Sequence, residues 1–153
     1  MQSILILHNL LRWAILFFGC WAFFNGIKGS INKSAFSSAD KKSGLFFMIF
    51  CDLQLLFGLI LFIKNGWFDK MKTSMGEAMK NPVDRFFIAE HAMMMVLAWI
   101  LVHIGYSAVK KAAPEKKHKK MIVFFGIALL LILISIPWEF KSVVARPNFR
   151  WFN

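Results

Sequence analysis

Polar side chains interrupt three of the four long apolar stretches of this chain. A polar group inside lipid is costly unless it has a partner, so such residues are candidate functional residues by default. The fourth stretch has none before Glu139, so we expect the chemistry to lie among the first three. The candidates are His8, Asn9, Arg12, Asp52, Gln54, Glu90, His91 and His103.

His8 and His91 have the placement that a metal cofactor between two helices requires. His8 lies four residues into the first stretch, and His91 lies five residues into the third. Alternate helices of an up-down arrangement run the same way. At about 1.5 Å per residue, both histidines therefore lie roughly 6–8 Å below one membrane surface. Two neutral imidazoles at one depth can ligate a haem iron. The alternative is an interfacial His8 bound to water or head groups and a core His91 bonded within the protein.

Arg12 lies one helical turn from His8 on the same helix face, so it is a candidate for the same site. A guanidinium pairs with a carboxylate through two hydrogen bonds, and haem carries two propionates. Arg12 lies deeper than His8, however. We therefore favour a buried ion pair of Arg12 with Asp52 or Glu90, and propionate contact is the second alternative. With Gln54, the two acids form a predicted buried polar cluster.

The other donor residues predict no second metal site. His103 lies about 18 Å deeper than His91. Its only possible partner, His118, falls in a run of lysines that we interpret as solvated. Cys20 and Cys51 lie inside apolar stretches, which favours buried thiols over a disulfide. No cluster of residues is suited to zinc or calcium.

The composition excludes several classes of protein. Apolar residues make up 58% of the 153 residues and charged residues 18%, whereas soluble domains carry about 25% charged residues. The apolar residues fall in four blocks, each near the length that crosses a bilayer. This pattern excludes a disordered chain, a nucleic-acid-binding module and an ordinary soluble enzyme. The predicted fold class is all-α, a single integral membrane domain over residues 1–153. We expect an up-down four-helix bundle with spans at about residues 4–27, 45–63, 83–108 and 121–136.

Local signals mark where these helices begin and end. Ser37 or Ser38 is placed to cap the second helix, Asn81-Pro82 begins the third, and Pro137 ends or kinks the fourth. In the long second connection, Ser74 and Glu77 have the spacing of a capping box. Met71, Met75 and Met79 recur every four residues there. They predict a short helix on the membrane surface, and an ordered loop packed on the bundle is the alternative.

The charges predict an orientation. Net charge is +11, and the basic residues lie in the connections, as the positive-inside rule describes, rather than in a nucleic-acid surface. The short third connection, residues 110–120, is dense in lysine, so we place both termini on the non-cytoplasmic side. Trp67, Trp138 and Trp151 should lie at one membrane level. The second connection and the amphiphilic tail should then cap the outer ends of the first and third helices.

Four segments of the chain resemble a known group of proteins. The segments are Leu7-His8-Asn9-Leu10-Leu11-Arg12-Trp13, Asp52-Leu53-Gln54-Leu55-Leu56-Phe57-Gly58-Leu59, Met75-Gly76-Glu77-Ala78-Met79-Lys80 and Arg85-Phe86-Phe87-Ile88-Ala89-Glu90-His91. The chain is similar, over nearly its whole length, to small bacterial four-helix membrane proteins labelled cytochrome b-like. The resemblance implies a location in the bacterial inner membrane and a role in electron transfer. It carries over only His8 and His91 as ligands, because this chain has no matching inner pair.

Three function hypotheses follow. The first is a protein that binds haem b through His8 and His91 and exchanges electrons with quinol or a partner redox protein, as a carrier rather than an enzyme. The second is a non-catalytic accessory subunit of a larger membrane complex, in which the polar residues hold the helices in register. The third is a proton or ion path, which would need a polar row across the whole bilayer.

Overall fold

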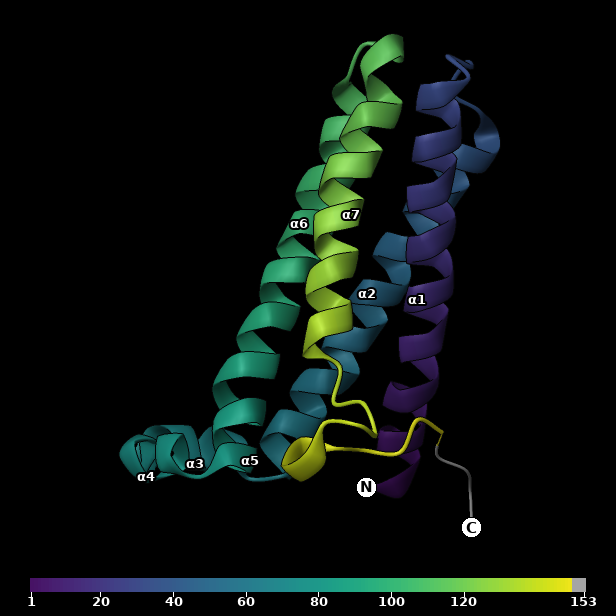
Figure 1. Cartoon of the computed structure of the whole chain (residues 1–153). Coiled ribbons are helices and arrows are strands. Elements are labelled where there is room, and N and C mark those ends of the chain that lie inside the picture. The colour runs from purple at the N-terminus through teal and green to yellow at the C-terminus, as the bar shows by residue number, and fades with distance from the viewer. Residues whose placement is uncertain (150–153) are drawn as a thin grey trace.

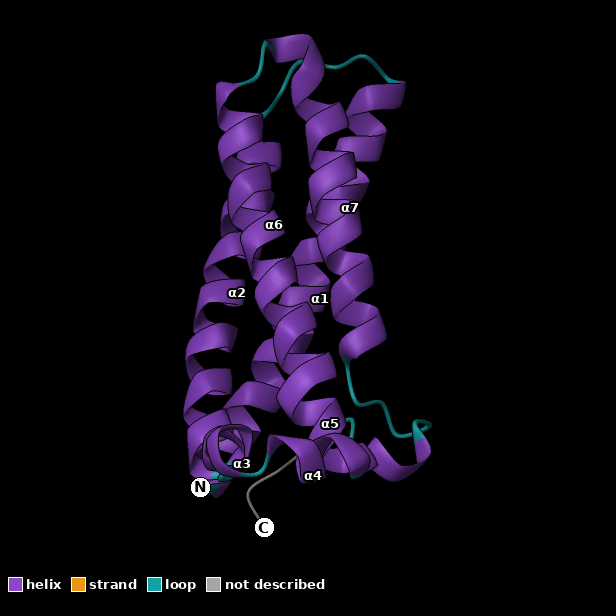
Figure 2. Ribbon diagram, turned by 90° about the vertical axis from the view of Figure 1, so that its left-hand side faces the viewer, coloured by secondary structure: helices purple, strands orange, loops and turns teal. Residues whose placement is uncertain are grey.

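The computed structural model describes residues 1–149, and every regular element in that range is helical. Four long helical segments dominate: α1 (Gln2–Ile31), α2 (Ser38–Lys64), the segment Pro82–Lys111 that ends in α6 (Ala92–Lys111), and α7 (Lys117–Ser135). They lie side by side, with α1 against α2 and α7, and α6 against α7 and α2 (Figures 1 and 2). All four are long and apolar enough to cross a membrane. The predictions of an all-α chain and of four such helices are therefore confirmed.

Short polar residues set most of the helix boundaries. Ser37 and Asp40 form a capping box at the start of α2, which satisfies amide groups that have no partner within the helix. Asn81 accepts hydrogen bonds from the next amides at the start of α5 (Pro82–Arg85). At the other end, α7 stops at Ser135, two residues before Pro137. These three predicted boundaries are confirmed.

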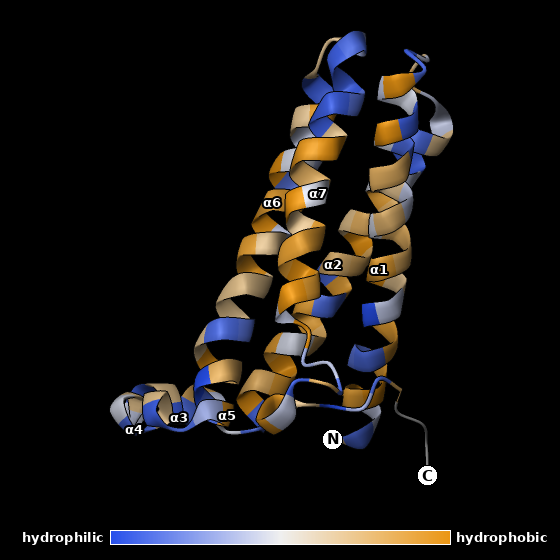
Figure 3. Ribbon diagram, in the orientation of Figure 1, coloured by the Kyte–Doolittle hydropathy of each residue, from blue (hydrophilic) through white to orange (hydrophobic). Residues whose placement is uncertain are grey.

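The long helices expose many large apolar residues and bury others between them. Large side chains such as Phe17, Phe24 and Leu130 are more than half exposed, which suits helices surrounded by hydrocarbon rather than water. Inside, the rings of Phe47 and Phe125 meet edge to face at 5.5 Å. Hydrophilic residues gather at the two ends of the long helices (Figure 3).

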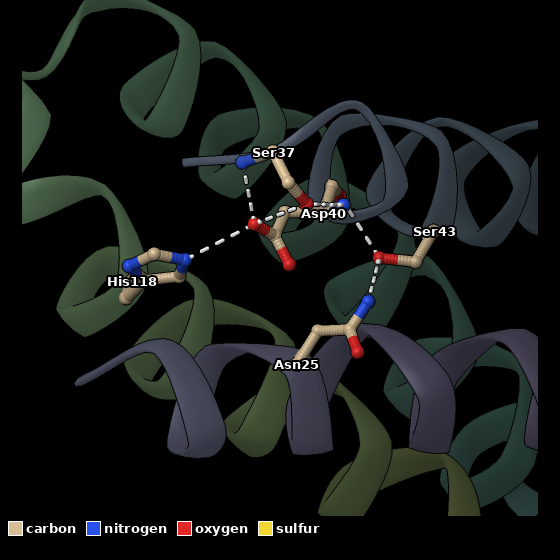
Figure 4. A network of polar contacts seen from close by, with 5 residues as sticks. All are labelled: Asn25, Ser37, Asp40, Ser43 and His118. Atoms are coloured by element: carbon tan, nitrogen blue, oxygen red, sulfur yellow. Dashed lines mark hydrogen bonds and ion pairs between the residues drawn. The ribbon is translucent and has the colours of Figure 1, made fainter. Parts of the chain in front are cut away.

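One end, which we call the lysine end, holds the connections 32–37 and 112–116. A buried polar network joins three helices there (Figure 4). Asp40 accepts hydrogen bonds from Ser37 and lies 3.2 Å from Nε2 of His118 on α7, while Asn25 on α1 donates to Ser43. His118 is only 4% exposed, so our prediction of a solvated His118 was wrong. The neighbouring lysines point outward, and the histidine faces inward because the helix turns each residue by about 100°.

The opposite end, which we call the cavity end, is where α1 begins. Three short helices lie at this end: α3 (Trp67–Thr73), α4 (Met75–Lys80) and α5, of which α3 and α4 extend sideways from the bundle beyond α6 (Figure 1). The single helix that we predicted is broken at Ser74, so Met71 and Met75 belong to different helices. Ser74 makes no capping bond, because its hydroxyl donates back to the carbonyl of Lys70. The predicted capping box at Ser74 and Glu77 was therefore wrong.

Candidate functional site

A cavity of about 380 Å³ lies between α1, α2 and the third long segment at the cavity end. Its volume is in the range of small-molecule and cofactor sites. Most of its wall is apolar. Its polar lining includes His8, Asn9, Arg12, Gln54, His91 and Arg146. The structure thus brings both predicted histidines to one cavity.

His91 is held by the end of a neighbouring helix. Its Nδ1 lies 2.8 Å from the carbonyl oxygen of Ser135, and because a carbonyl can only accept, Nδ1 must carry the proton. The Ser135 carbonyl is available because α7 ends at that residue. This bond assigns the tautomer and leaves Nε2 with a lone pair, as in most histidines that ligate metals. Within the described residues, Nε2 of His91 has no hydrogen-bond partner.

The backbone around His91 is a π-helix, which the sequence pattern did not reveal. The π segment covers Phe86–His91 and connects α5 to α6. One extra residue in a helical turn rotates the following side chains by about 100° relative to a continuous α-helix. Such segments occur often at functional sites. Here the segment places His91 on the cavity wall, while Glu90 is directed outward.

The side chain of His8 on α1 packs against α2. Its Nε2 lies 3.3 Å from the amide nitrogen of Gln54. A Cβ at Gly58 would come within 3.3 Å of the ring, so glycine leaves room for the imidazole there. Three buried atoms on this wall have no partner in the described structure: Nδ1 of His8, Oε1 of Gln54 and Oδ1 of Asn9. Buried polar atoms are rarely left unpaired. A cluster of them in one cavity indicates a site for a polar or metal-bearing ligand.

Arg12 does not pair with either acid that we predicted. Its guanidinium donates to the backbone carbonyl of Asn148 and lies over the ring of Trp138 at 5.6 Å. Asp52 instead accepts from Trp99 at 2.6 Å, on the far side of α2. Glu90 pairs with Arg85 at 3.0 Å and its side chain is about half exposed. Asp52, Gln54 and Glu90 therefore do not form one buried cluster, because they lie on three different helix faces.

The cavity wall is electrostatically one-sided. Arg12 and Arg146 both line it, and no Asp or Glu of the described chain does. The Arg146 guanidinium also stacks over the Phe87 ring at 4.8 Å. Sequence reasoning missed Arg146, because it lies in the tail, 134 residues from Arg12 along the chain. Only its place among aromatic residues in an amphiphilic tail hinted at a role.

Residues 136–149, which we call the strap, close the cavity end. The strap leaves α7, crosses to α1 and contains a single 3₁₀ turn, Ser142–Val144 (Figure 1). Asn9 donates to the carbonyl of Pro147 at 3.1 Å, and Trp13 donates to that of Asn148 at 3.0 Å. The prediction of a cap over the histidines is confirmed for these residues. Trp151, which we placed at the same level, lies outside the described residues.

Trp13 is expected to hold the strap closed. Its indole donates to Asn148, and its ring stacks on Phe149 with centroids 5.0 Å apart. Trp13→Leu removes both the hydrogen bond and the ring stack, which should lower the free energy that holds the strap closed by about 2 kcal/mol. Opening of the strap should then increase roughly 10- to 30-fold. Trypsin cleavage after Lys141 in detergent measures this opening.

The matched control is Trp21→Leu, which removes an indole from α1 away from the strap. Its ring has Phe18 as a neighbour, at 6.0 Å. The control should be cleaved at the wild-type rate. Equal cleavage of the two variants would show that Trp13 does not hold the strap.

Within residues 1–149, no group of three or more His, Cys, Asp or Glu residues is placed to hold a metal ion. This finding does not bear on haem, whose porphyrin supplies four ligands and leaves two for the protein. No protein-family model, curated protein or solved structure matches the chain. The site must therefore be interpreted from its own geometry.

Proposed function

We propose that the chain is a b-type haem protein of the bacterial inner membrane that carries electrons between a quinol or partner redox protein and a second partner. The observation that carries this proposal is the pair His8 and His91 on one cavity wall. His91 has its tautomer assigned by Ser135, with Nε2 available for ligation. His8 lies on the same wall, with its Nε2 at 3.3 Å from the amide nitrogen of Gln54.

The residues around the cavity fit this group in charge as well as in ligands. His8 and His91 would ligate the iron, and Arg12 and Arg146 would face its two propionates. Haem supplies, when bound, an iron that gains and loses one electron. The strap and the aromatic side chains would shield the bound group from water on their side of the cavity, which would lower the dielectric and strengthen charge interactions there. Gln54 would turn its amide away from His8 to free Nε2.

We further propose an up-down membrane bundle with both termini on the non-cytoplasmic side. The distribution of basic residues supports this orientation. The positive-inside rule counts lysine and arginine near the ends of the spans, and acids contribute little to it. The lysine end holds ten lysines, six of them within the short stretch 110–120. They are Lys28, Lys33, Lys41, Lys42, Lys110, Lys111, Lys116, Lys117, Lys119 and Lys120. This density of lysine places the lysine end on the cytoplasmic side in our proposal.

Single cysteines test the orientation. In a chain carrying Cys20→Ser and Cys51→Ala, a cysteine is placed at Ser34 in the lysine-end loop or at Ser74 between α3 and α4. A membrane-impermeant maleimide added to intact spheroplasts should label only the Ser74→Cys protein. Lysis should then expose Ser34→Cys to the reagent. Labelling of Ser34→Cys before lysis would reverse the orientation.

A pyridine haemochrome assay tests the cofactor. Protein purified from cells supplied with ample haem should contain about one haem b per chain and show a low-spin visible spectrum, as two histidine ligands require. Circular dichroism on the same sample verifies the helical fold. A colourless but fully helical protein would contradict the proposal and favour the accessory-subunit hypothesis.

A further inference from the structure

A second polar group lies behind the cavity wall, on the seam between α2 and α6. Oδ1 of Asp52 accepts from the indole of Trp99 at 2.6 Å and lies 3.2 Å from Nε2 of His103. Nδ1 of His103 donates to the carbonyl of Trp99 at 3.1 Å. The side chains are not enclosed by the chain, since that of Asp52 is 44% exposed and that of His103 is 34% exposed.

This group lies halfway along the apolar helices. Asp52 is ten residues from Lys42 and twelve from Lys64, which places it about 15–18 Å from either end of the span. In the proposed bundle that position is the middle of the hydrocarbon. Ionisable residues at this depth almost always face a protein interior or a water-filled cavity. An Asp–His pair on the outer face therefore indicates that another molecule covers it.

The hydrogen bonds define what the cover must offer. A carbonyl cannot donate, so Nδ1 of His103 carries a proton. Oδ1 of Asp52 accepts the indole hydrogen of Trp99, and the second carboxylate oxygen, Oδ2, keeps its lone pairs. Within the described residues Oδ2 accepts no hydrogen bond, so the seam presents an open acceptor.

The same seam presents an open donor. Tyr106 is the one tyrosine of a chain with 18 phenylalanines, and it follows Trp99 and His103 on one face of α6. It packs over α2, where a Cβ at Gly44 would lie 3.8 Å from its Cδ2. Its hydroxyl makes no hydrogen bond within residues 1–149. Helical side chains lean towards the N-terminus, so Tyr106 leans towards the depth of Asp52.

We propose that the α2–α6 seam is the interface between two copies of this chain, in which Tyr106 of each copy donates to Asp52 of the other. A two-fold axis along the membrane normal keeps equivalent residues of the two copies at the same depth in the membrane. The contact between Tyr106 of one copy and Asp52 of the other is therefore made twice. Lipid is as apolar as leucine, so hydrogen bonds and close packing, rather than hydrophobicity, select a partner in the membrane. An unpaired acceptor and an unpaired donor on one surface are self-complementary.

The second copy would also close the cavity from the side. Leu59 on α2 and Val96 on α6 both line the cavity, yet they are 51% and 39% exposed. The cavity wall therefore reaches the outer surface along this seam. Leu53, Leu56 and Ile104 are exposed on the same two helices and would supply the packing.

Cross-linking in native membranes tests the geometry. In the chain without native cysteines, Leu53→Cys, Leu56→Cys and Ile104→Cys are oxidised in separate samples. The matched control is Leu130→Cys, which is 56% exposed on α7, away from the seam. At least one seam position should yield a disulfide-linked dimer several times more efficiently than the control. Cross-linking of all three seam variants at the level of the control overturns the proposal.

Association in liposomes tests the hydrogen bond itself. Tyr106→Phe removes one hydroxyl from each copy and should weaken dimerisation roughly 5- to 10-fold, as expected for two interhelical hydrogen bonds. The matched control is Ser107→Ala, which removes an exposed hydroxyl from the next residue of α6 and should not change the association constant. Energy transfer between labelled chains at varied protein-to-lipid ratios measures both.

Two results would overturn the proposal. One is a chain that stays monomeric at every ratio, which would leave the seam to a lipid or a different subunit. The other is a dimer indifferent to Tyr106→Phe. Neither readout depends on what the cavity binds, so failure here is distinguishable from failure of the haem proposal.

Discussion

Replacement of His91 by alanine should leave the purified protein with less than about a tenth of the wild-type haem. Loss of a residue that only supports a metal ligand lowers metal affinity by roughly 10- to 100-fold, and loss of the ligand itself should exceed that. His91 is held in position by the Ser135 carbonyl at 2.8 Å, and alanine provides no ligand atom in its place. His8→Ala should have a similar effect. Haem per chain, measured by pyridine haemochrome, gives the result directly.

The matched control is His103→Ala, which removes a histidine from the same long segment but outside the cavity. His103 faces Asp52 and is not among the cavity-lining residues, so this variant should keep its haem. Added imidazole should partly restore a low-spin spectrum to His91→Ala, because the truncated side chain leaves space for a free ligand. A His91→Ala protein with full haem and an unchanged spectrum would exclude His91 as a ligand.

Gly29→Ala should destabilise the protein by about 2–4 kcal/mol, the largest effect that we expect for the loss or gain of a single methyl group. A Cβ at Gly29 would overlap the imidazole of His118. The ring cannot move aside without cost, because it is buried and lies against Asp40 (Figure 4). Displacement would leave a buried carboxylate without that partner. Thermal unfolding in detergent, followed by circular dichroism, measures the change.

Gly76→Ala serves as the control for the same substitution. Nothing lies within 4 Å of a Cβ at that position, so the change should be neutral or stabilise α4 by up to about 1 kcal/mol. The double variant Gly29→Ala with His118→Ala should lose less unfolding free energy than the two single variants lose in total. The reason is that truncation of the His118 ring removes the overlap with the new methyl group. Equal stability of Gly29→Ala and Gly76→Ala would show that the position of the His118 ring does not depend on the space left by Gly29.

The number of long helices and most of their boundaries could be predicted from the sequence, because the deciding interactions are local. The apolar blocks are long enough to cross a membrane, and that depends only on composition along the chain. Ser37 with Asp40, Asn81 with Pro82, and the stop before Pro137 act within a few residues of their own backbone. Ser74 failed as a cap because the preceding helix competed for its hydroxyl.

The pairing of His8 with His91 could be predicted only as matched depth along two helices. The position of a residue along the helix axis follows from the rise per residue. The face on which its side chain lies can be predicted only if the helix turns by the same angle at every residue. The π segment Phe86–His91 interrupts that rotation. It turns Glu90 outward to Arg85. Asp52 on α2 faces Trp99 of α6 instead, so the buried cluster that we predicted did not form.

The partners of Arg12 and His118 were decided by the tertiary structure alone. Arg12 donates to a carbonyl 136 residues away, and His118 meets Asp40 78 residues away. Neither contact could be predicted from the sequence pattern. Every residue carries a backbone carbonyl, so no residue type marks the one that Arg12 contacts. A single histidine among lysines likewise resembles its solvated neighbours. By itself, the sequence determined the four long helices and how far along its helix each polar residue lies. The tertiary structure decided which faces meet, since that requires the packing of all four helices and the strap at once.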